Sequence, residues 1–173
     1  EIMIAARKGR CCRFNEEEVR AIGRSGSGVR GINIDEDDEV IGAISANPNA
    51  EDAAAHTVLV VSENGYGKRS DPDEYRLTSR GAKGVKTINI TDKTGPLVAI
   101  KSVTEENDLM IITKSGLTIR MAVSDIRVAG RATQGVRLIN IREGDAIAAV
   151  SPVAKAEEEL QEDAPEAETE VTE

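Results

Sequence analysis

The stretch "GRSGSGVRGINI" at residues 23–34 occurs twice more in similar form, as "SRGAKGVKTINI" at 79–90 and "GRATQGVRLINI" at 130–141. Each version places a glycine-rich basic loop before an Ile-Asn-Ile run. The copies are separated by 56 and then 51 residues. Self-similarity at a spacing of this kind predicts an array of similar structural units.

The alignment holds without a gap from the hairpin glycine to the Ile-Asn-Ile run of each copy. The corresponding positions include Gly9, Gly65 and Gly116; Arg13, Arg69 and Arg120; Arg24, Arg80 and Arg131; and Arg30, Lys86 and Arg137. The additional length of the first copy lies in a Pro/Asn/Ala-rich connector, "SANPNAEDAAAHT" at 45–57.

Each copy begins with the pattern of a β-hairpin. "TVLVVSENGYGKRS" at 57–70 is an apolar run, an Asn-Gly turn and a return strand, and 2–14 and 109–121 repeat this plan. We expect the turn at Asn64-Gly65 to be of type I′. A short stretch follows, then the strand that contains Ile-Asn-Ile, a turn and a last apolar run. Residues 15–21 and their equivalents are predicted to be a turn leading into a short strand, with a single helical turn as the alternative.

The sequence therefore predicts an all-β, propeller-like array of about three four-stranded antiparallel blades. The predicted blades span 1–50, 51–104 and 105–154. The predicted core includes Tyr75 and the isoleucines of the three Ile-Asn-Ile runs: Ile32, Ile34, Ile88, Ile90, Ile139 and Ile141. Closed propellers need about 4 to 8 blades, and the chain begins inside a strand-like run, so we expect a piece of a longer polypeptide.

The charge of −9 is concentrated at one end of the chain. Residues 155–173 hold nine acidic residues and one lysine, which leaves 21 basic and 22 acidic residues in residues 1–154. The tail is predicted to be disordered, because it is strongly charged and poor in bulky apolar residues. The body is nearly neutral and has room for local basic patches.

Several classes of function are disfavoured. No apolar run approaches the length of a membrane helix, about 18 residues or more. Cys11 and Cys12 are adjacent, so on a strand they point to opposite faces, and we expect two reduced thiols. His56 is the single histidine and is expected to be a loop residue. We therefore predict no catalytic residues, no metal site and no cofactor in this chain.

The repeat, a hydrophobic hairpin followed by Arg-x-x-Gly-Arg-x-x-x-Gly-Val-Arg-x-Ile-Asn-Ile, resembles the C-terminal DNA-wrapping domain, or β-pinwheel, of the bacterial DNA gyrase A subunit. The similarity covers residues 1 to 153 and is greatest over 107–145. The family carries a box, Gln-Arg-Arg-Gly-Gly-Lys-Gly, on the first blade. The nearest stretch here is "TSRGAKG" at 78–84, which keeps Arg80, Gly81, Lys83 and Gly84 and departs from the box elsewhere. The resemblance therefore implies later blades of the domain.

The resemblance implies non-sequence-specific binding and wrapping of duplex DNA, in support of ATP-dependent negative supercoiling. It implies a non-catalytic domain within a type II topoisomerase, an assembly of two gyrase A with two gyrase B subunits (A2B2), and a cytoplasmic, nucleoid-associated location in bacteria. The alternatives are a protein-interaction propeller and the C-terminal domain of the A subunit of topoisomerase IV.

The loop arginines are the candidate DNA contacts, because they lie between small residues where no apolar surface requires them. Regularly spaced cations on a curved rim can follow a phosphate backbone without reading sequence. The predicted DNA-binding residues are Arg24, Arg80, Lys83, Arg131, Arg30, Lys86, Arg137, Arg13, Lys68, Arg69 and Arg120. By contrast, Arg20, Arg76 and Arg127 follow acidic residues and are expected to form ion pairs. An aromatic content of 2% favours duplex over single-stranded DNA.

Overall fold

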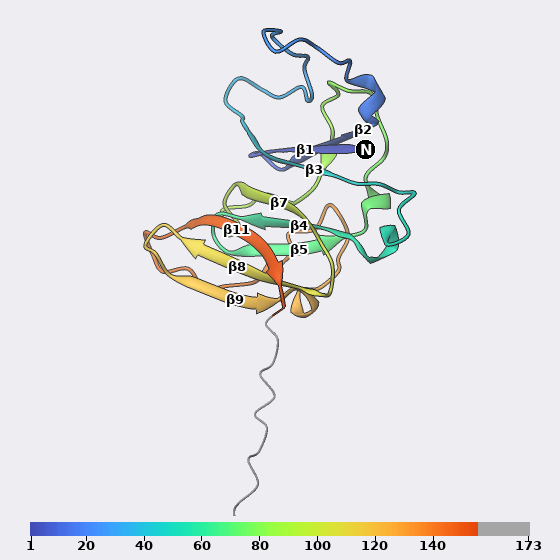
Figure 1. The fold of residues 1–173 in the computed structure, drawn as a ribbon. Helices are drawn as coiled ribbons and strands as arrows, with labels where there is room; N and C mark the ends of the chain where they lie inside the picture. The colour runs from blue at the N-terminus through green and yellow to red at the C-terminus, as the bar shows by residue number, and fades with distance from the viewer. Residues whose placement is uncertain (156–173) are drawn as a thin grey trace, which may run out of the picture.

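Three antiparallel β-sheets follow one another along the chain and lie one beneath the other in Figure 1. The computed structural model describes residues 1–155, and the remainder of the predicted acidic tail, 156–173, lies outside the described residues. This arrangement confirms the predicted all-β class. No helix of residues 1–155 has the length and apolar character to cross a membrane.

Residues 1–155 form eleven strands and four one-turn 3-10 helices. Their bounds are β1 Ile2–Ala6, β2 Arg10–Phe14, η1 Glu16–Glu18, β3 Val40–Ser45, η2 Ala53–Ala55, β4 Thr57–Ser62, β5 Tyr66–Ser70, η3 Pro72–Glu74, β6 Val85–Lys86, β7 Leu97–Val103, β8 Asn107–Thr113, β9 Thr118–Ala122, η4 Val123–Asp125, β10 Val136–Arg137 and β11 Ile147–Ala154.

The second and third copies each contribute one strand, named here an exchanged strand, to the sheet of the preceding copy, which the repeat pattern did not predict. The sheets have the strand orders β3-β1-β2-β6, β10-β5-β4-β7 and β11-β8-β9. In the first sheet β6, from the second copy, pairs with β2, and in the second sheet β10, from the third copy, pairs with β5. The prediction of four strands folding into their own blade was therefore wrong in one strand: each fourth strand completes the sheet of the preceding copy. The third sheet has three strands.

The exchanged strands β6 and β10 are two residues long each. Gly84 and Gly135 have φ of 73° and 80°, and they bring the backbone against the return strand of the preceding sheet. Residues 28–34 of the first copy join no sheet among residues 1–155. The predicted strand at each Ile-Asn-Ile run is instead irregular backbone.

The predicted core isoleucines nevertheless lie where expected. Ile32, Ile88 and Ile139 are buried, and the second isoleucine of each run is partly buried against the same apolar clusters. Tyr75 is buried as predicted, and its hydroxyl forms a hydrogen bond with Thr87. Irregular backbone can bury these side chains because its polar groups bond to neighbouring copies, as in the bond from Asn89 N–H to Thr133 O of 3.1 Å.

Two of the three apolar clusters of residues 1–155 lie between sheets. One apolar cluster joins the first and second sheets and includes Met3, Val60 and Ile100. Another joins the second and third sheets and includes Leu59 and Ile111. Consecutive residues of β4 thus point to opposite neighbours, as the alternation of a strand requires, and the middle sheet is covered on both faces.

The hairpin turns differ from the predicted type. Gly65 has a positive φ of 88°, but no residue other than glycine has a positive φ among residues 1–155, so Asn64 cannot occupy a type I′ position. Gly65 N–H donates to Ser62 O, and Gly9 and Gly116 make the equivalent bonds in their copies. The glycine therefore closes a turn of type I geometry that ends in a left-handed residue. The stretches after the hairpins form η1, η3 and η4, which is the alternative of a single helical turn.

The packing of the exchanged strands predicts that alanine has different costs at three equivalent glycines. Gly28, Gly84 and Gly135 are equivalent and all have a positive φ, so alanine should cost each about 1–2 kcal/mol. A methyl group at Gly84 would collide with the carbonyl oxygen of Cys11, and one at Gly135 would lie 2.6 Å from that of Gly67, whereas Gly28 has open space. Gly84→Ala and Gly135→Ala should therefore lower the free energy of unfolding by about 2–3 kcal/mol more than Gly28→Ala, measured by urea denaturation. Equal losses at the three glycines would contradict this packing of the exchanged strands.

Candidate nucleic-acid interface

Three basic segments follow the one-turn helices after the hairpins, and the second and third of them include the exchanged strands β6 and β10. We name residues 20–30, 76–86 and 127–137 the rim segments. Together they contain ten lysine and arginine residues and no acidic residue, whereas the rest of residues 1–154 contains eleven basic and twenty-two acidic residues. The nearly neutral body therefore separates its charges, and the cations gather on equivalent stretches of the copies.

Arg80 fastens the second rim segment to the first. Its backbone N–H donates to Glu18 Oε2 at 2.7 Å, its Nε to the carbonyl oxygen of Glu18 at 3.0 Å, and its Nη1 to the carbonyl oxygen of Arg30 at 2.7 Å. A further bond of 2.9 Å joins Gly81 N–H to Gly31 O.

Arg131 fastens the third rim segment to the second in the same way. Its backbone N–H donates to Glu74 Oε2 at 2.6 Å and its Nε to the carbonyl oxygen of Glu74 at 3.0 Å, while Nη1 donates to the carbonyl oxygen of Lys86. Because the acceptors are the repeat equivalents of those of Arg80, the rim segments lie side by side along one edge. Arg80 and Arg131 thus occupy equivalent places on it.

Neither clamping guanidinium group forms an ion pair with a carboxylate among residues 1–155. Their acceptors are backbone carbonyls, and the nearby carboxylates bond to the backbone N–H instead. Both side chains are half-buried, and within residues 1–155 Nη2 of each donates to no other residue. Each clamp therefore holds a cation in a fixed orientation with one nitrogen available. Arg24, the equivalent of the first copy, is exposed and makes none of these bonds.

Four other predicted contacts, Arg30, Lys83, Lys86 and Arg137, are exposed on the rim segments. Arg137 lies over the ring of Tyr66, with its guanidinium carbon 5.4 Å from the ring centroid, and Nη2 donates to the Tyr66 hydroxyl at 3.1 Å. This cation–π contact holds the end of the third rim segment against β5.

Three residues predicted to contact DNA are instead buried. Arg13, Lys68 and Arg69 are 8%, 0% and 4% exposed. Arg13 Nη1 donates to the carbonyl oxygens of Pro72 and Tyr75, and Arg69 Nε to that of Ile126. They lie on β2 and β5, where Leu77 and Val128 of the following copy form isolated bridges with Arg13 and Arg69, so they join copies instead of facing a ligand. Arg120, the third equivalent, is exposed and bonds to Asp108 Oδ2 at 2.8 Å.

The sequence held a signal for the buried lysine. In the repeat alignment Lys68 corresponds to Cys12 and Ile119, which are apolar residues, and an apolar counterpart indicates an interior position. Burial lowers the pKa of Lys68 to about 8, with Glu74 raising it and Arg131 lowering it to a smaller extent. The side chain is therefore mostly protonated at neutral pH.

Sequence reasoning also misplaced three arginines. Arg20, Arg76 and Arg127 were expected to pair with nearby carboxylates, yet all three are exposed and none takes part in an ion pair among residues 1–155. The acidic neighbours were the misleading signal, because Glu18 and Glu74 bond to the backbone of the following rim segment. The three arginines therefore join the candidate interface.

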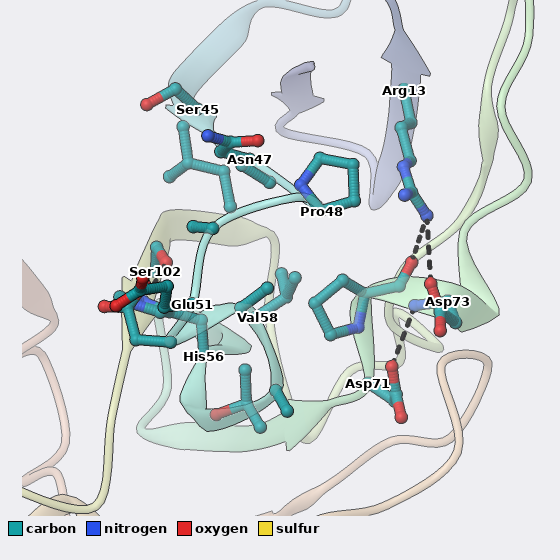
Figure 2. Close-up of a pocket in the computed structure, with 18 residues that line it drawn as sticks. Arg13, Ser45, Asn47, Pro48, Glu51, His56, Val58, Asp71, Asp73 and Ser102 are labelled. Carbon is teal, nitrogen blue, oxygen red and sulfur yellow. Dashed lines mark hydrogen bonds and ion pairs between the residues drawn. The ribbon is translucent and has the colours of Figure 1, made fainter.

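The connector forms a cavity of about 630 Å³, away from the rim segments (Figure 2). Figure 2 shows Arg13 reaching Asp73 and the carbonyl of Pro72 on one side, and His56 beside Ser102 on the other. His56 Nδ1 lies 3.1 Å from Ser102 Oγ, and Nε2 lies 3.1 Å from Asp52 Oδ2. His56 is thus a connector residue, as predicted. No group of three potential metal ligands occurs in the described part of the chain.

The clamp geometry predicts a difference between equivalent arginines. Arg80→Ala and Arg131→Ala each remove two bonds from a guanidinium to carbonyls, so each should lower the free energy of unfolding by about 1–3 kcal/mol. Arg24→Ala, at the equivalent position without these bonds, should change it by less than about 0.5 kcal/mol. Urea denaturation of the three variants measures the difference, and an equal loss for Arg24→Ala would contradict the assignment.

The pKa of Lys68 predicts a pH dependence of stability. Between pH 8 and 10.5 the unfolded chain binds a proton at this lysine that the folded chain has lost, so the free energy of unfolding rises with pH. The free energy of unfolding of the wild type minus that of Lys68→Met should therefore increase by at most about 1.4 kcal/mol per pH unit in that window. Denaturation at several pH values measures this, and a constant difference would argue against the lowered pKa.

Comparisons with known proteins agree with this architecture. The family model described as "DNA gyrase C-terminal domain, beta-propeller" matches residues 1–47, 56–104 and 107–154. The chain is 46% identical over 164 residues to the A subunit of DNA gyrase from Staphylococcus aureus strain NCTC 8325, and 45% identical over 163 residues to that of strain MRSA252. Each alignment covers 94% of this chain and 18% of the relative, so the chain spans about a fifth of the length of these proteins.

Solved structures match the fold. The structure of a DNA gyrase A C-terminal domain has a TM-score of 0.77 and 26% identity, covering 87% of this chain and 50% of that chain. The C-terminal domain of a DNA topoisomerase IV has a TM-score of 0.78 at 19% identity, covering 88% and 46% of the two chains, and shows the fold alone. With three sheets, three repeat matches and this relatedness, the chain belongs to the family of DNA gyrase C-terminal β-propeller domains.

Proposed function

We propose that this chain binds duplex DNA without sequence preference and bends it along the rim segments. The observation that carries the proposal is the pair of clamps at Arg80 and Arg131. Both hold a charged guanidinium in the same orientation on the same edge, one copy apart, beside exposed cations of the rim segments.

The chemistry of this edge suits phosphate better than bases. Duplex DNA carries one negative charge per about 1.7 Å of its axis, so cations repeated from copy to copy can follow the backbone around a curve. Such contacts orient the duplex and carry no sequence information. The clamps add rigidity, because a guanidinium held by two carbonyls does not have to be ordered when DNA binds.

Family membership supports a role within a larger enzyme. We propose that the chain is part of the A subunit of a DNA gyrase, in which two A and two B subunits assemble (A2B2) in the bacterial cytoplasm, at the nucleoid. There the domain would present a bent duplex segment for ATP-dependent strand passage and negative supercoiling. We assign no catalytic step, metal or cofactor to this chain. The A subunit of a topoisomerase IV is the alternative within the same fold.

A second candidate is a surface that binds a protein. Leu77 and Val128 are equivalent residues of two rim segments, and they are 54% and 50% exposed. Exposed apolar side chains beside arginines also occur at protein interfaces. The two candidates differ in their response to salt, because phosphate contacts release counterions and apolar contacts do not.

The test is a titration of a fluorescent duplex of random sequence by fluorescence anisotropy at several salt concentrations. We expect affinity to fall steeply between about 50 and 200 mM salt. Lys83→Ala/Lys86→Ala should reduce the slope of log K against log salt by about 0.9 for each lost phosphate contact. Lys93→Ala is the matched control, an exposed lysine outside the rim segments. A flat salt response, or an equal effect of Lys93→Ala, would reject DNA binding by this edge.

A further inference from the structure

The buried lysine on β5 lies in an unusual environment. The Nζ atom of Lys68 contacts four oxygens of the third rim segment: the carbonyls of Gly130 at 2.6 Å and Thr133 at 3.0 Å, the hydroxyl of Thr133 at 3.3 Å, and the carbonyl of Arg131. No carboxylate is among these partners. The residues of the loop 130–133 therefore turn their oxygens inward around one point that carries a positive charge.

An arrangement of neutral oxygens around one cation is also how proteins hold potassium. Backbone carbonyls replace the water molecules around a weakly hydrated monovalent ion. An ammonium group and a weakly hydrated monovalent ion bind the same kind of oxygen ligand. The loop therefore has the ligands of a monovalent-cation site, and the chain supplies the cation from its own side chain.

The equivalent contact in the preceding copy is much weaker. Cys12 takes the place of Lys68, and its Sγ lies 3.9 Å from Ser79 O and 3.6 Å from Thr78 Oγ1. The first and second copies thus meet without a cation at this point. The charge is specific to the contact between the second and third copies, which provides an internal control.

We propose that the loop 130–133 is a site for a small monovalent cation, that the ammonium of Lys68 occupies it, and that Lys68 thereby positions Arg131 and the third rim segment. Lys68 donates to the loop from β5, and Arg131, within the loop, donates to the carbonyls of Glu74 and Lys86 of the second copy. Together they fix the spacing between two groups of exposed cations. The effect on DNA rests on the proposed function; the cation site does not.

The test uses the full chain with Lys68→Ala, which empties the site and leaves room for an added cation. At pH 7 and equal ionic strength, n-propylammonium or potassium should raise the Tm of this variant by about 2–4 °C relative to tetramethylammonium, which has no N–H and is too large for the carbonyls. The wild type and Lys68→Met, whose side chain fills the space, should show no such difference. An equal Tm of Lys68→Ala in all three salts would overturn the cation site.

DNA affinity tests the positioning role of Lys68, because a purely structural role would leave the affinity unchanged. Lys68→Ala should bind the duplex about tenfold more weakly than the wild type in tetramethylammonium, the order of one lost charge-assisted hydrogen bond, and n-propylammonium should restore the affinity. Cys12→Ala is the matched control and should bind as the wild type does. Unchanged affinity of Lys68→Ala would overturn the positioning role. Absence of DNA binding by the wild type would instead refute the proposed function, and the Tm series would still decide the cation site.

A measurement on the wild type covers the case in which Lys68→Ala does not fold. Acetylation by an N-hydroxysuccinimide ester at pH 7.5, followed by mass spectrometry, should label Lys68 at least about tenfold more slowly than the exposed Lys83 and Lys86. Labelling at the same rate as these lysines would overturn the proposal.

Discussion

The structure depends on one constraint: the return strand of each hairpin has a hydrogen-bonding edge that its own copy does not cover. β2 finds its partner in β6 and β5 finds its partner in β10, both of which belong to the next copy. Unpaired backbone groups in the interior are costly, so a copy cannot complete its sheet alone. The glycines, the clamps and the buried cations all occur at this junction between copies.

The same junction explains how a chain of negative overall charge presents a basic edge. The rim segment must pass close to the preceding copy to deliver its strand, and carbonyl oxygens there accept bonds from Arg80 and Arg131. A carbonyl holds a guanidinium in place without neutralising its charge, whereas a carboxylate would hold it and also neutralise its charge. The acidic residues Glu18 and Glu74 take up backbone N–H groups instead. Folding therefore orders the cations and leaves them charged.

The repeat itself was enough to predict the fold class, the hairpins and the core positions Ile32, Ile88 and Ile139, because periodic apolar residues report burial directly. It did not predict the partner of each strand. A strand such as Val85–Lys86 has the same pattern whether it pairs within its copy or with the preceding one. The turn at Asn64 was misassigned because Asn-Gly also suits a turn in which only the glycine is left-handed.

The candidate site was only partly predictable from the sequence. The loop position of Arg24, Arg80 and Arg131 predicted contacts with DNA. Only the structure shows that Arg80 and Arg131 donate to carbonyls of the neighbouring copy. Arg13 and Arg69 were mistaken for surface cations because a charged residue usually lies outside, and the carbonyls that hold them are 57 residues or more away in the sequence. The alignment of Lys68 with Cys12 and Ile119 was the one informative signal that went unused.

The exchanged strands also delay the completion of each sheet during synthesis of the chain. While it emerges from the ribosome, the first sheet stays one strand short until Val85 and Lys86 have been synthesised, and the second until Val136 and Arg137 follow. Each edge is exposed for the time that about 70 residues take, several seconds at about 5–20 residues per second. Until then, the open edge of one nascent chain is available to the matching strand of a chain on a neighbouring ribosome, so slow synthesis favours pairing with the wrong copy.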